Sequence, residues 1–153
     1  MKNILASFLL FTFLIISCDV NNGRSIQEEP GSIEAVDQWK SNDFDYYTFL
    51  VNRTCLCRLP YEYTVEVFHG RVINVYFDKE DHLNYESRDM LISSTRTIDQ
   101  LFELLERYKE TADHYEVEFH NKLGYPTNIN INPSTEIADE EIKLVISNLT
   151  SRS

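Results

Sequence analysis

Apolar and polar residues alternate along 61–77, and this alternation restricts the fold more than any other feature of the sequence. The stretch reads YEYTVEVFHGRVINVYF. Successive side chains of a β-strand point to opposite faces, so each alternating run has one face that must be covered. Gly70 lies between the two runs and can adopt a positive φ at little cost, as a tight hairpin turn requires. The stretch therefore predicts a β-hairpin.

Two helices are predicted from apolar residues at helical spacing. From Ile33 onward, apolar residues recur at i, i+3 and i+6, and Ser32 is placed to cap a helix over about 32–42. A second helix is expected over about 97–111. It opens with Thr-Ile-Asp-Gln, a capping box in which the threonine hydroxyl and the glutamine amide satisfy free N–H groups at the helix start.

Four further strand segments complete the pattern. FDYYTFLV precedes the hairpin, and HYEVEFH, PTNININ and EIKLVISNL follow the second helix. Helix and three strands thus occur twice, and the similar layout of WKSNDFDYYTF and YKETADHYEVEF suggests a duplication. Residues 78–89 are expected to form a charged connection. The sequence predicts an α+β fold, a two-layer antiparallel sheet of about six strands covered on one face by two helices.

The first 17 residues have the layout of a secretory signal peptide. Lys2 gives a positive start, and residues 4–16 form an uncharged, mostly apolar run. As a helix this run would span about 20 Å, which is shorter than the roughly 30 Å hydrocarbon core of a bilayer. We therefore expect a segment that is removed during export rather than a membrane span.

The motif IISC, which ends at Cys18, resembles a bacterial lipobox. This resemblance implies cleavage before Cys18, lipidation of its sulfur and acylation of the new amino terminus. Two or more acyl chains make membrane anchoring stable. Residues 18–31 are polar and are predicted to be a flexible tether, which leaves 32–153 as a single domain.

The chain is acidic, with 25 Asp and Glu against 14 Lys and Arg and a formal charge of −11. Removal of residues 1–17 takes away Lys2 and no acid, which changes −11 to −12. This charge argues against binding to nucleic acid, and it disfavours binding to anionic lipid except through a covalent anchor. It would attract a cationic protein partner, or it serves only to keep the domain soluble.

Cys55 and Cys57 are the cysteines that remain once Cys18 is assigned to the lipid. On a regular strand their Cα atoms would lie about 6.6 Å apart, near the upper limit for a disulfide. A local disulfide, two unbonded thiols and redox or metal chemistry all remain compatible with the sequence. The flanking Arg53 and Arg58 would favour a thiolate, whereas a zinc site would need further ligands.

The strand HYEVEFH places two histidines and two glutamates on one face. His114, Glu116, Glu118 and His120 are of the types that bind a divalent cation, but the outer two would lie about 20 Å apart, so one ion cannot bind all four. We interpret this face as solvent-exposed and predict no metal site.

The stretch GYPTNININP has two interpretations. Gly124 and Pro126 are typical of a rigid turn that leads into a strand. Alternatively, Tyr125 and Pro126 anchor a protein partner, because a tyrosine presents a rigid amphipathic surface.

Several marks follow one another in a fixed order along the chain. They are Trp39, Tyr46-Tyr47, Cys55-x-Cys57, Val65-x-Val67 with Gly70 and Val72, Thr97-Ile98-x-x-Leu101-Phe102, Gly124-Tyr125-Pro126 and Asp139-Glu140-Glu141. This ordered set resembles the bacterial family named domain of unknown function 6174, over roughly residues 33–149. The resemblance implies a small exported protein, often a lipoprotein, and it implies no activity.

No catalytic motif, nucleotide-binding loop or cofactor motif occurs in the sequence. We therefore expect a non-catalytic binding module without cofactor, anchored by lipid to a bacterial membrane and facing the periplasm or the cell exterior. One alternative is an inhibitor of a cationic envelope or wall-degrading enzyme. Another is a thiol/disulfide redox protein that uses Cys55 and Cys57.

Overall fold

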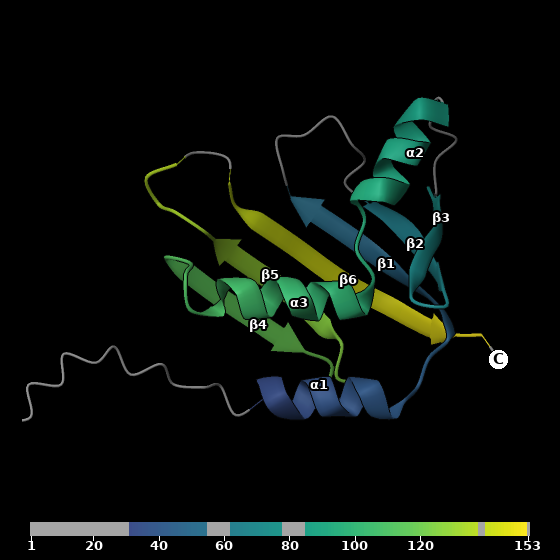
Figure 1. The fold of residues 1–153 in the computed structure, drawn as a ribbon, viewed down its shortest axis with the longest axis horizontal. Coiled ribbons are helices and arrows are strands. Elements are labelled where there is room, and N and C mark those ends of the chain that lie inside the picture. The colour runs from purple at the N-terminus through teal and green to yellow at the C-terminus, as the bar shows by residue number, and fades with distance from the viewer. Residues whose placement is uncertain (1–30, 55–61, 78–84, 138–139, 153) are drawn as a thin grey trace, which may run out of the picture.

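A computed structural model describes residues 31–54, 62–77, 85–137 and 140–152. This part of the chain forms a single sheet with three helices packed around it (Figure 1). In chain order the elements are α1 (Ser32–Ser41), β1 (Tyr46–Thr54), β2 (Glu62–Phe68), β3 (Arg71–Tyr76), α2 (Tyr85–Ser94), α3 (Ile98–Lys109), β4 (His114–Phe119), β5 (Pro126–Asn132) and β6 (Ile142–Ser151).

The six strands form one antiparallel sheet with the order β3-β2-β1-β6-β5-β4. β1, β2 and β3 are a meander, and β4, β5 and β6 are a second one. The two meanders join where the first strand pairs with the last, β1 with β6. The predicted α+β class and the six-stranded antiparallel sheet are therefore confirmed.

The predicted hairpin is β2 and β3. His69 and Gly70 form its two-residue loop with φ of 48° and 68°. Positive φ at both central residues matches the right-handed twist of the flanking strands. A bulge between Glu66 and Val67 shifts the register, so Val67 pairs with Val72.

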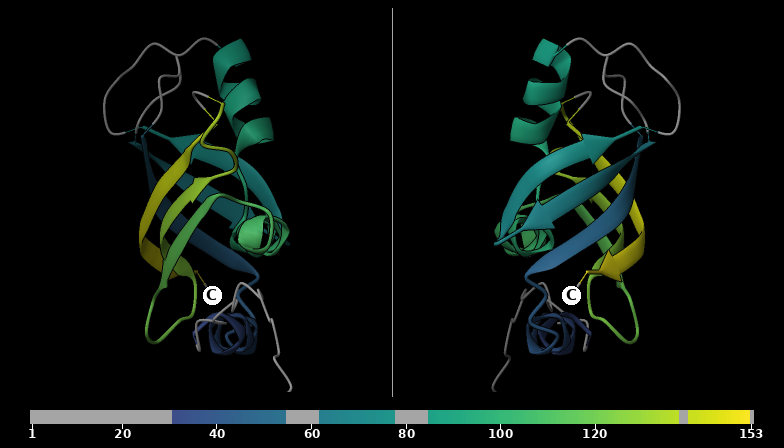
Figure 2. Two further views of the ribbon diagram at one scale, coloured as in Figure 1. Left: turned by 90° about the vertical axis from the view of Figure 1, so that its left-hand side faces the viewer. Right: turned by 90° about the vertical axis from the view of Figure 1, so that its right-hand side faces the viewer.

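The helices take three different positions relative to the sheet. α3 lies across one face, over the half built from β4, β5 and β6, while α2 stands beside β3 and α1 lies at the end of the sheet (Figures 1 and 2). The opposite face carries none of the three described helices. The fold is thus two-layered, as predicted, with an open outer face.

The prediction of a charged connection over 78–89 is wrong from Tyr85 onward, where α2 begins. The helix could not be recognised in the sequence, because its residues show little of the apolar and polar periodicity of an amphipathic helix. Leu91 holds α2 against the domain, since its side chain is completely buried in the core.

The core lies between the covered face of the sheet and α3. Alternate residues of β1, which are Tyr47, Phe49 and Val51, are buried, as the period of two requires. α3 contributes the apolar stripe Ile98, Leu101, Phe102, Leu104 and Leu105. The Tyr47 hydroxyl accepts a hydrogen bond of 3.3 Å from the backbone N–H of Ile98, and burial raises the pKa of Tyr47 well above its usual value.

The predicted capping box of α3 is confirmed. The Thr97 hydroxyl accepts from the backbone N–H of Gln100 at 3.3 Å, and the Gln100 side chain accepts from the backbone N–H of Thr97 at 3.0 Å. The predicted cap of α1 is displaced by one residue. Ser32 is the first helical residue, and Gly31 occupies the N-cap position without a side-chain hydrogen bond.

α1 is fastened to the rest of the fold at three places. The Trp39 indole donates to an Asp99 carboxylate oxygen at 3.1 Å, which ties α1 to the start of α3. The Gln38 amide donates to the backbone carbonyls of Asn121 and Lys122, in the β4–β5 connection. Gly124 in the same connection packs directly on α1, because a Cβ there would lie 2.2 Å from the carbonyl oxygen of Ala35.

Replacement of Gly124 by alanine is expected to lower the free energy of unfolding by about 2–4 kcal/mol. Alanine costs about 1 kcal/mol at a positive φ, and the collision with α1 adds an overpacking penalty. Gly70→Ala is the matched control, since φ is also positive there but no atom lies within 4 Å of the new Cβ. Urea denaturation measures both, and equal losses in the two variants would contradict the close packing of α1 on Gly124.

Candidate functional site

A groove of about 650 Å³ runs between α1 and α3. Two helical stripes line it, with spacings of i, i+3, i+4 and i+7 on each helix. The stripe of α1 is Ile33, Val36, Asp37 and Lys40, and that of α3 is Asp99, Phe102, Glu103 and Glu106, with Ser32 at the end. We call this the α1–α3 groove. Its volume lies within the range of ligand-binding pockets.

The floor of the groove is apolar. Ile33 is 62% exposed, which is unusual for isoleucine, and Val36 is partly buried beside it. Phe102 closes the floor from α3 and stacks on Phe119 of β4, with ring centroids 6.1 Å apart. The apolar stripe of α1 that was predicted from the sequence therefore divides between two environments. Trp39 enters the core, whereas Ile33 remains uncovered.

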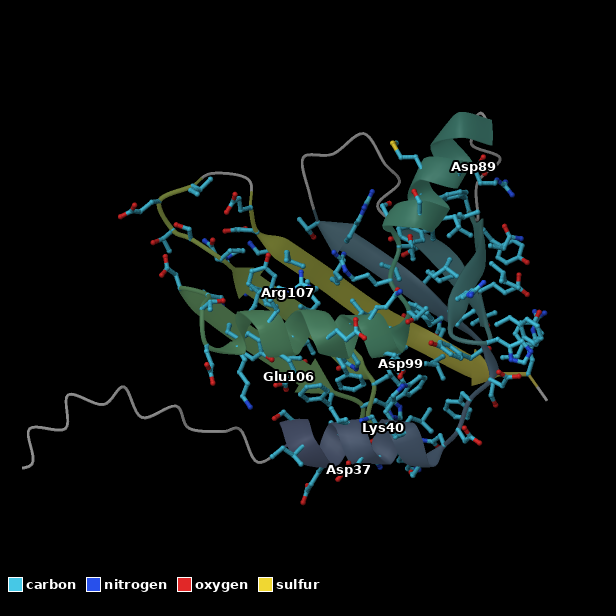
Figure 3. All side chains as sticks on the ribbon, in the orientation of Figure 1. Asp37, Lys40, Asp89, Asp99, Glu106 and Arg107 are labelled. Atoms are coloured by element: carbon cyan, nitrogen blue, oxygen red, sulfur yellow. The ribbon has the colours of Figure 1, made fainter. Side chains whose placement is uncertain are left out.

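The rim of the groove is acidic. Asp99, Glu103 and Glu106 come from α3 and Asp37 from α1, while Lys40 is the one cation among the lining residues. Figure 3 shows Asp37 and Lys40 on α1 beside Asp99 and Glu106 on α3. Four carboxylates around an apolar floor favour a ligand that is both cationic and amphipathic.

The groove has the chemistry of a binding site. Its nine lining residues include no histidine or cysteine, and Ser32 supplies the only hydroxyl side chain. A nucleophile without a neighbouring base is not activated, so these lining residues do not form a catalytic set. The sequence contains the signal for this site in the double stripe, but each polar position taken alone looks like an ordinary solvent-exposed one.

A second polar cluster lies on the open outer face of the sheet. The Glu66 carboxylate accepts hydrogen bonds from the hydroxyls of Tyr46 and Tyr76. Arg152 approaches it to 3.8 Å and donates to the Tyr46 hydroxyl at 3.2 Å. These partners leave the Glu66 side chain only 7% exposed on an otherwise open face. The hydrogen bond from Tyr46 is the larger cause, and that from Tyr76 the next, of a pKa of the Glu66 carboxyl below its ordinary value.

The histidines and glutamates of HYEVEFH do not come together as one group. His114 lies 3.7 Å from Glu116 and contacts Asn130, on the outer face. His120 follows the end of β4 and instead accepts hydrogen bonds from the backbone of the β4–β5 connection. Among the described residues, no group of three or more His, Cys, Asp or Glu is arranged to hold a metal ion.

Tyr125 and Pro126, the predicted partner anchors, lie in the interior. Tyr125 is 4% exposed, stacks on His120 with centroids 4.8 Å apart, and is hydrogen-bonded to the backbone at Leu149. Pro126 is fully buried at the first residue of β5. Both residues therefore belong to a rigid turn that leads into a strand, which is the first of the two interpretations of this stretch. A partner could not reach the tyrosine ring. Burial raises the pKa of Tyr125.

The three cysteines lie outside the described residues. Cys18 precedes residue 31, and Cys55 and Cys57 fall between β1 and β2. The lipidation of Cys18 and the state of the other two thiols stay predictions. In the part of the chain that the structure describes, no helix is long and apolar enough to cross a membrane.

Comparison with known families places the chain in a family. A family model described as a family of unknown function, DUF6174, matches residues 33–151. The match extends over most of the sequence, so the chain belongs to this family. No curated protein and no solved structure matches the chain.

Replacement of Glu66 by glutamine is expected to lower the free energy of unfolding by about 1–2 kcal/mol at pH 7, because two tyrosine hydroxyls lose a charged acceptor. The folded pKa of Glu66 lies below the ordinary value of 4.5. The stabilisation is therefore complete above about pH 5 and is lost as the pH falls through the folded pKa.

Urea titrations of both proteins from pH 7 to pH 3 measure this effect. The difference in stability should shrink only at the acid end of the range. Glu62→Gln, at an exposed position on the same strand, should show little difference at any pH. If the stability difference between Glu66→Gln and the parent stayed constant across the whole pH range, the charge of the Glu66 carboxylate would not be the source of the stabilisation.

Proposed function

We propose that this chain is a lipid-anchored, non-catalytic binding module of the bacterial cell envelope, and that it holds a cationic amphipathic helix of a partner protein in the α1–α3 groove. The observation that carries the proposal is the groove itself, in which an apolar floor is bordered by four carboxylates. The overall acidity of the chain supports the same kind of partner.

The apolar floor supplies contact area for the proposed partner. Ile33 is 62% exposed, and full burial of an isoleucine contributes roughly 1.5–3 kcal/mol. Amphipathic helices bind in this way, with apolar residues at i, i+3, i+4 and i+7 in a hydrophobic groove. Because the partner side chains would enter between two helices, the contact would resemble the packing of a third helix.

The carboxylates supply selectivity and a faster encounter. Asp99, Glu103 and Glu106 lie on one stripe of α3, so they present three charges along the length of the groove. A helix with Lys or Arg beside its apolar stripe would place each cation near one of them. Such exposed pairs contribute little energy individually, but several together raise the association rate and exclude acidic segments.

The lipid would keep the groove close to the membrane. α1 begins at Ser32, directly after the predicted tether 18–31. A flexible segment of this length has an end-to-end distance of roughly 20 Å, so the α1 side of the groove would stay near the surface to which Cys18 is attached. An envelope partner would therefore meet the groove at a raised local concentration.

Charge reversal tests the groove. A labelled helical peptide of Leu and Lys at amphipathic spacing is titrated with residues 18–153, and fluorescence anisotropy is read. We expect saturable binding that weakens at least fivefold between 50 and 300 mM salt, and no binding of a Leu/Glu peptide. Glu103→Lys with Glu106→Lys should weaken binding at least tenfold.

The matched control for this test is Glu116→Lys with Glu118→Lys, the same change of charge on β4 of the outer face. It should retain most of the binding, since it lies outside the groove. Ile33→Ser should weaken binding without loss of stability, because this side chain is exposed. Equal losses of peptide affinity in the two charge-reversed pairs would show that binding depends on net charge alone, and would overturn the proposal that the peptide binds in the groove.

A separate experiment tests the anchor. The full chain expressed in bacteria should enter the membrane fraction with an intact mass that includes acyl chains on a protein beginning at Cys18. Cys18→Ala should prevent lipidation and release the protein from the membrane fraction. An unlipidated mature protein would contradict the proposed lipid anchor, but it would not affect the proposal that the groove binds a partner helix.

A further inference from the structure

Arg53 near the end of β1 holds part of its charged group inside the fold. The side chain lies on the covered face, with its guanidinium carbon 5.8 Å from the ring centroid of Tyr63. Its Nε and Nη2 atoms are buried and have no hydrogen-bond partner among the described residues. The hydroxyl of Thr95, between α2 and α3, is buried without a partner as well.

The two unpartnered nitrogens of Arg53 form one edge of the guanidinium. Their N–H bonds point in nearly the same direction, and this edge matches the two oxygens of a carboxylate. Burial of a charge without a counter-charge is strongly unfavourable, so such groups in proteins are almost always paired. The geometry therefore leaves a place for an anion.

A cavity of about 60 Å³ lies at this place. Arg53, Thr95 and Arg96 line it together with apolar side chains that include Val51 and Leu101. Among the described residues, two arginines and no acid line it, in a chain where acids outnumber bases by 25 to 14. The charge of this site is thus opposite to that of the chain as a whole.

The cavity is adjacent to a wider opening. Ser94, Thr95 and Arg96 also line a polar depression of about 530 Å³ beside α3, together with Gln100 and Arg107. A small anion could therefore arrive through a depression that carries two arginines. The depression is distinct from the α1–α3 groove, with which it shares one lining residue, Glu103.

We propose that this cavity binds the carboxylate group of a small organic acid, with the Arg53 edge and the Thr95 hydroxyl as donors. Three donors suit the two oxygens of a carboxylate, whereas the four oxygens of phosphate would leave several unsatisfied. The Ser94 hydroxyl adds no donor, because it already donates to the Leu91 carbonyl at 3.1 Å. The aliphatic walls provide contact for a short carbon chain. Acetate and propionate are of the size that the cavity admits.

Acetate, propionate, phosphate and chloride are titrated into residues 18–153 at constant ionic strength. The ¹H and ¹⁵N resonances of the Arg53 Nε–H group and the melting temperature are followed. Acetate and propionate should shift the Arg53 resonance to saturation and raise Tm by about 4 °C at ten times the dissociation constant. Chloride and phosphate should do neither.

Arg53→Met keeps the aliphatic stem but removes the guanidinium, so it should abolish the response of Tm to acetate. Without ligand it should melt at the same temperature as the parent or higher, since a buried unpaired charge is gone. Thr95→Val should weaken acetate binding at least threefold. Arg71→Met, at an exposed position on β3, is the control and should respond as the parent does.

Three results would overturn the proposal. Saturation by phosphate but not by acetate would assign the site to another anion. No response of the Arg53 resonance to any anion would show that water satisfies the guanidinium. An undiminished response of Tm in Arg53→Met would place the acetate site elsewhere on the protein.

Discussion

The pairing of β1 with β6 is the interaction on which the rest of the structure depends. Each three-stranded meander can form locally, but each has an edge strand that would remain unpaired alone. Antiparallel bonds between Tyr47–Thr54 and Lys143–Ser151 convert two edges into the middle of one six-stranded sheet. The resulting face is wide enough for α3 to cover, and the central side chains Val51 and Ile146 lie directly opposite each other in the core.

Local signals in the sequence predicted most of the fold. The alternation over 61–77 gives β2 and β3, and the Thr97 capping box gives the start of α3. Both signals depend on neighbouring residues alone, so they can be recognised without knowledge of the tertiary structure. The pairing of β1 with β6 could not be recognised in this way, because it joins segments about a hundred residues apart.

Other features depend on packing that the sequence does not record. α2 has little amphipathic character, and among its described side chains the buried Leu91 and the partly buried Ile92 pack against the core. Tyr125 looks like a surface anchor in the sequence, but the turn at Gly124 directs it inward beneath the end of β6. The α1–α3 groove escaped prediction for a related reason. Its two stripes are ordinary in isolation, and only the position of α1 brings them face to face.

The order of the strands has a consequence for how the chain matures. β6 is the last strand in sequence, yet it occupies a central position in the sheet. A growing chain therefore lacks the middle of its sheet until residue 151 has been made, and shorter nascent chains can hold only half-domains with open edges. Completion of the sheet is therefore delayed until the final strand is present, and this delay follows from the topology alone, whatever the stability of the finished domain.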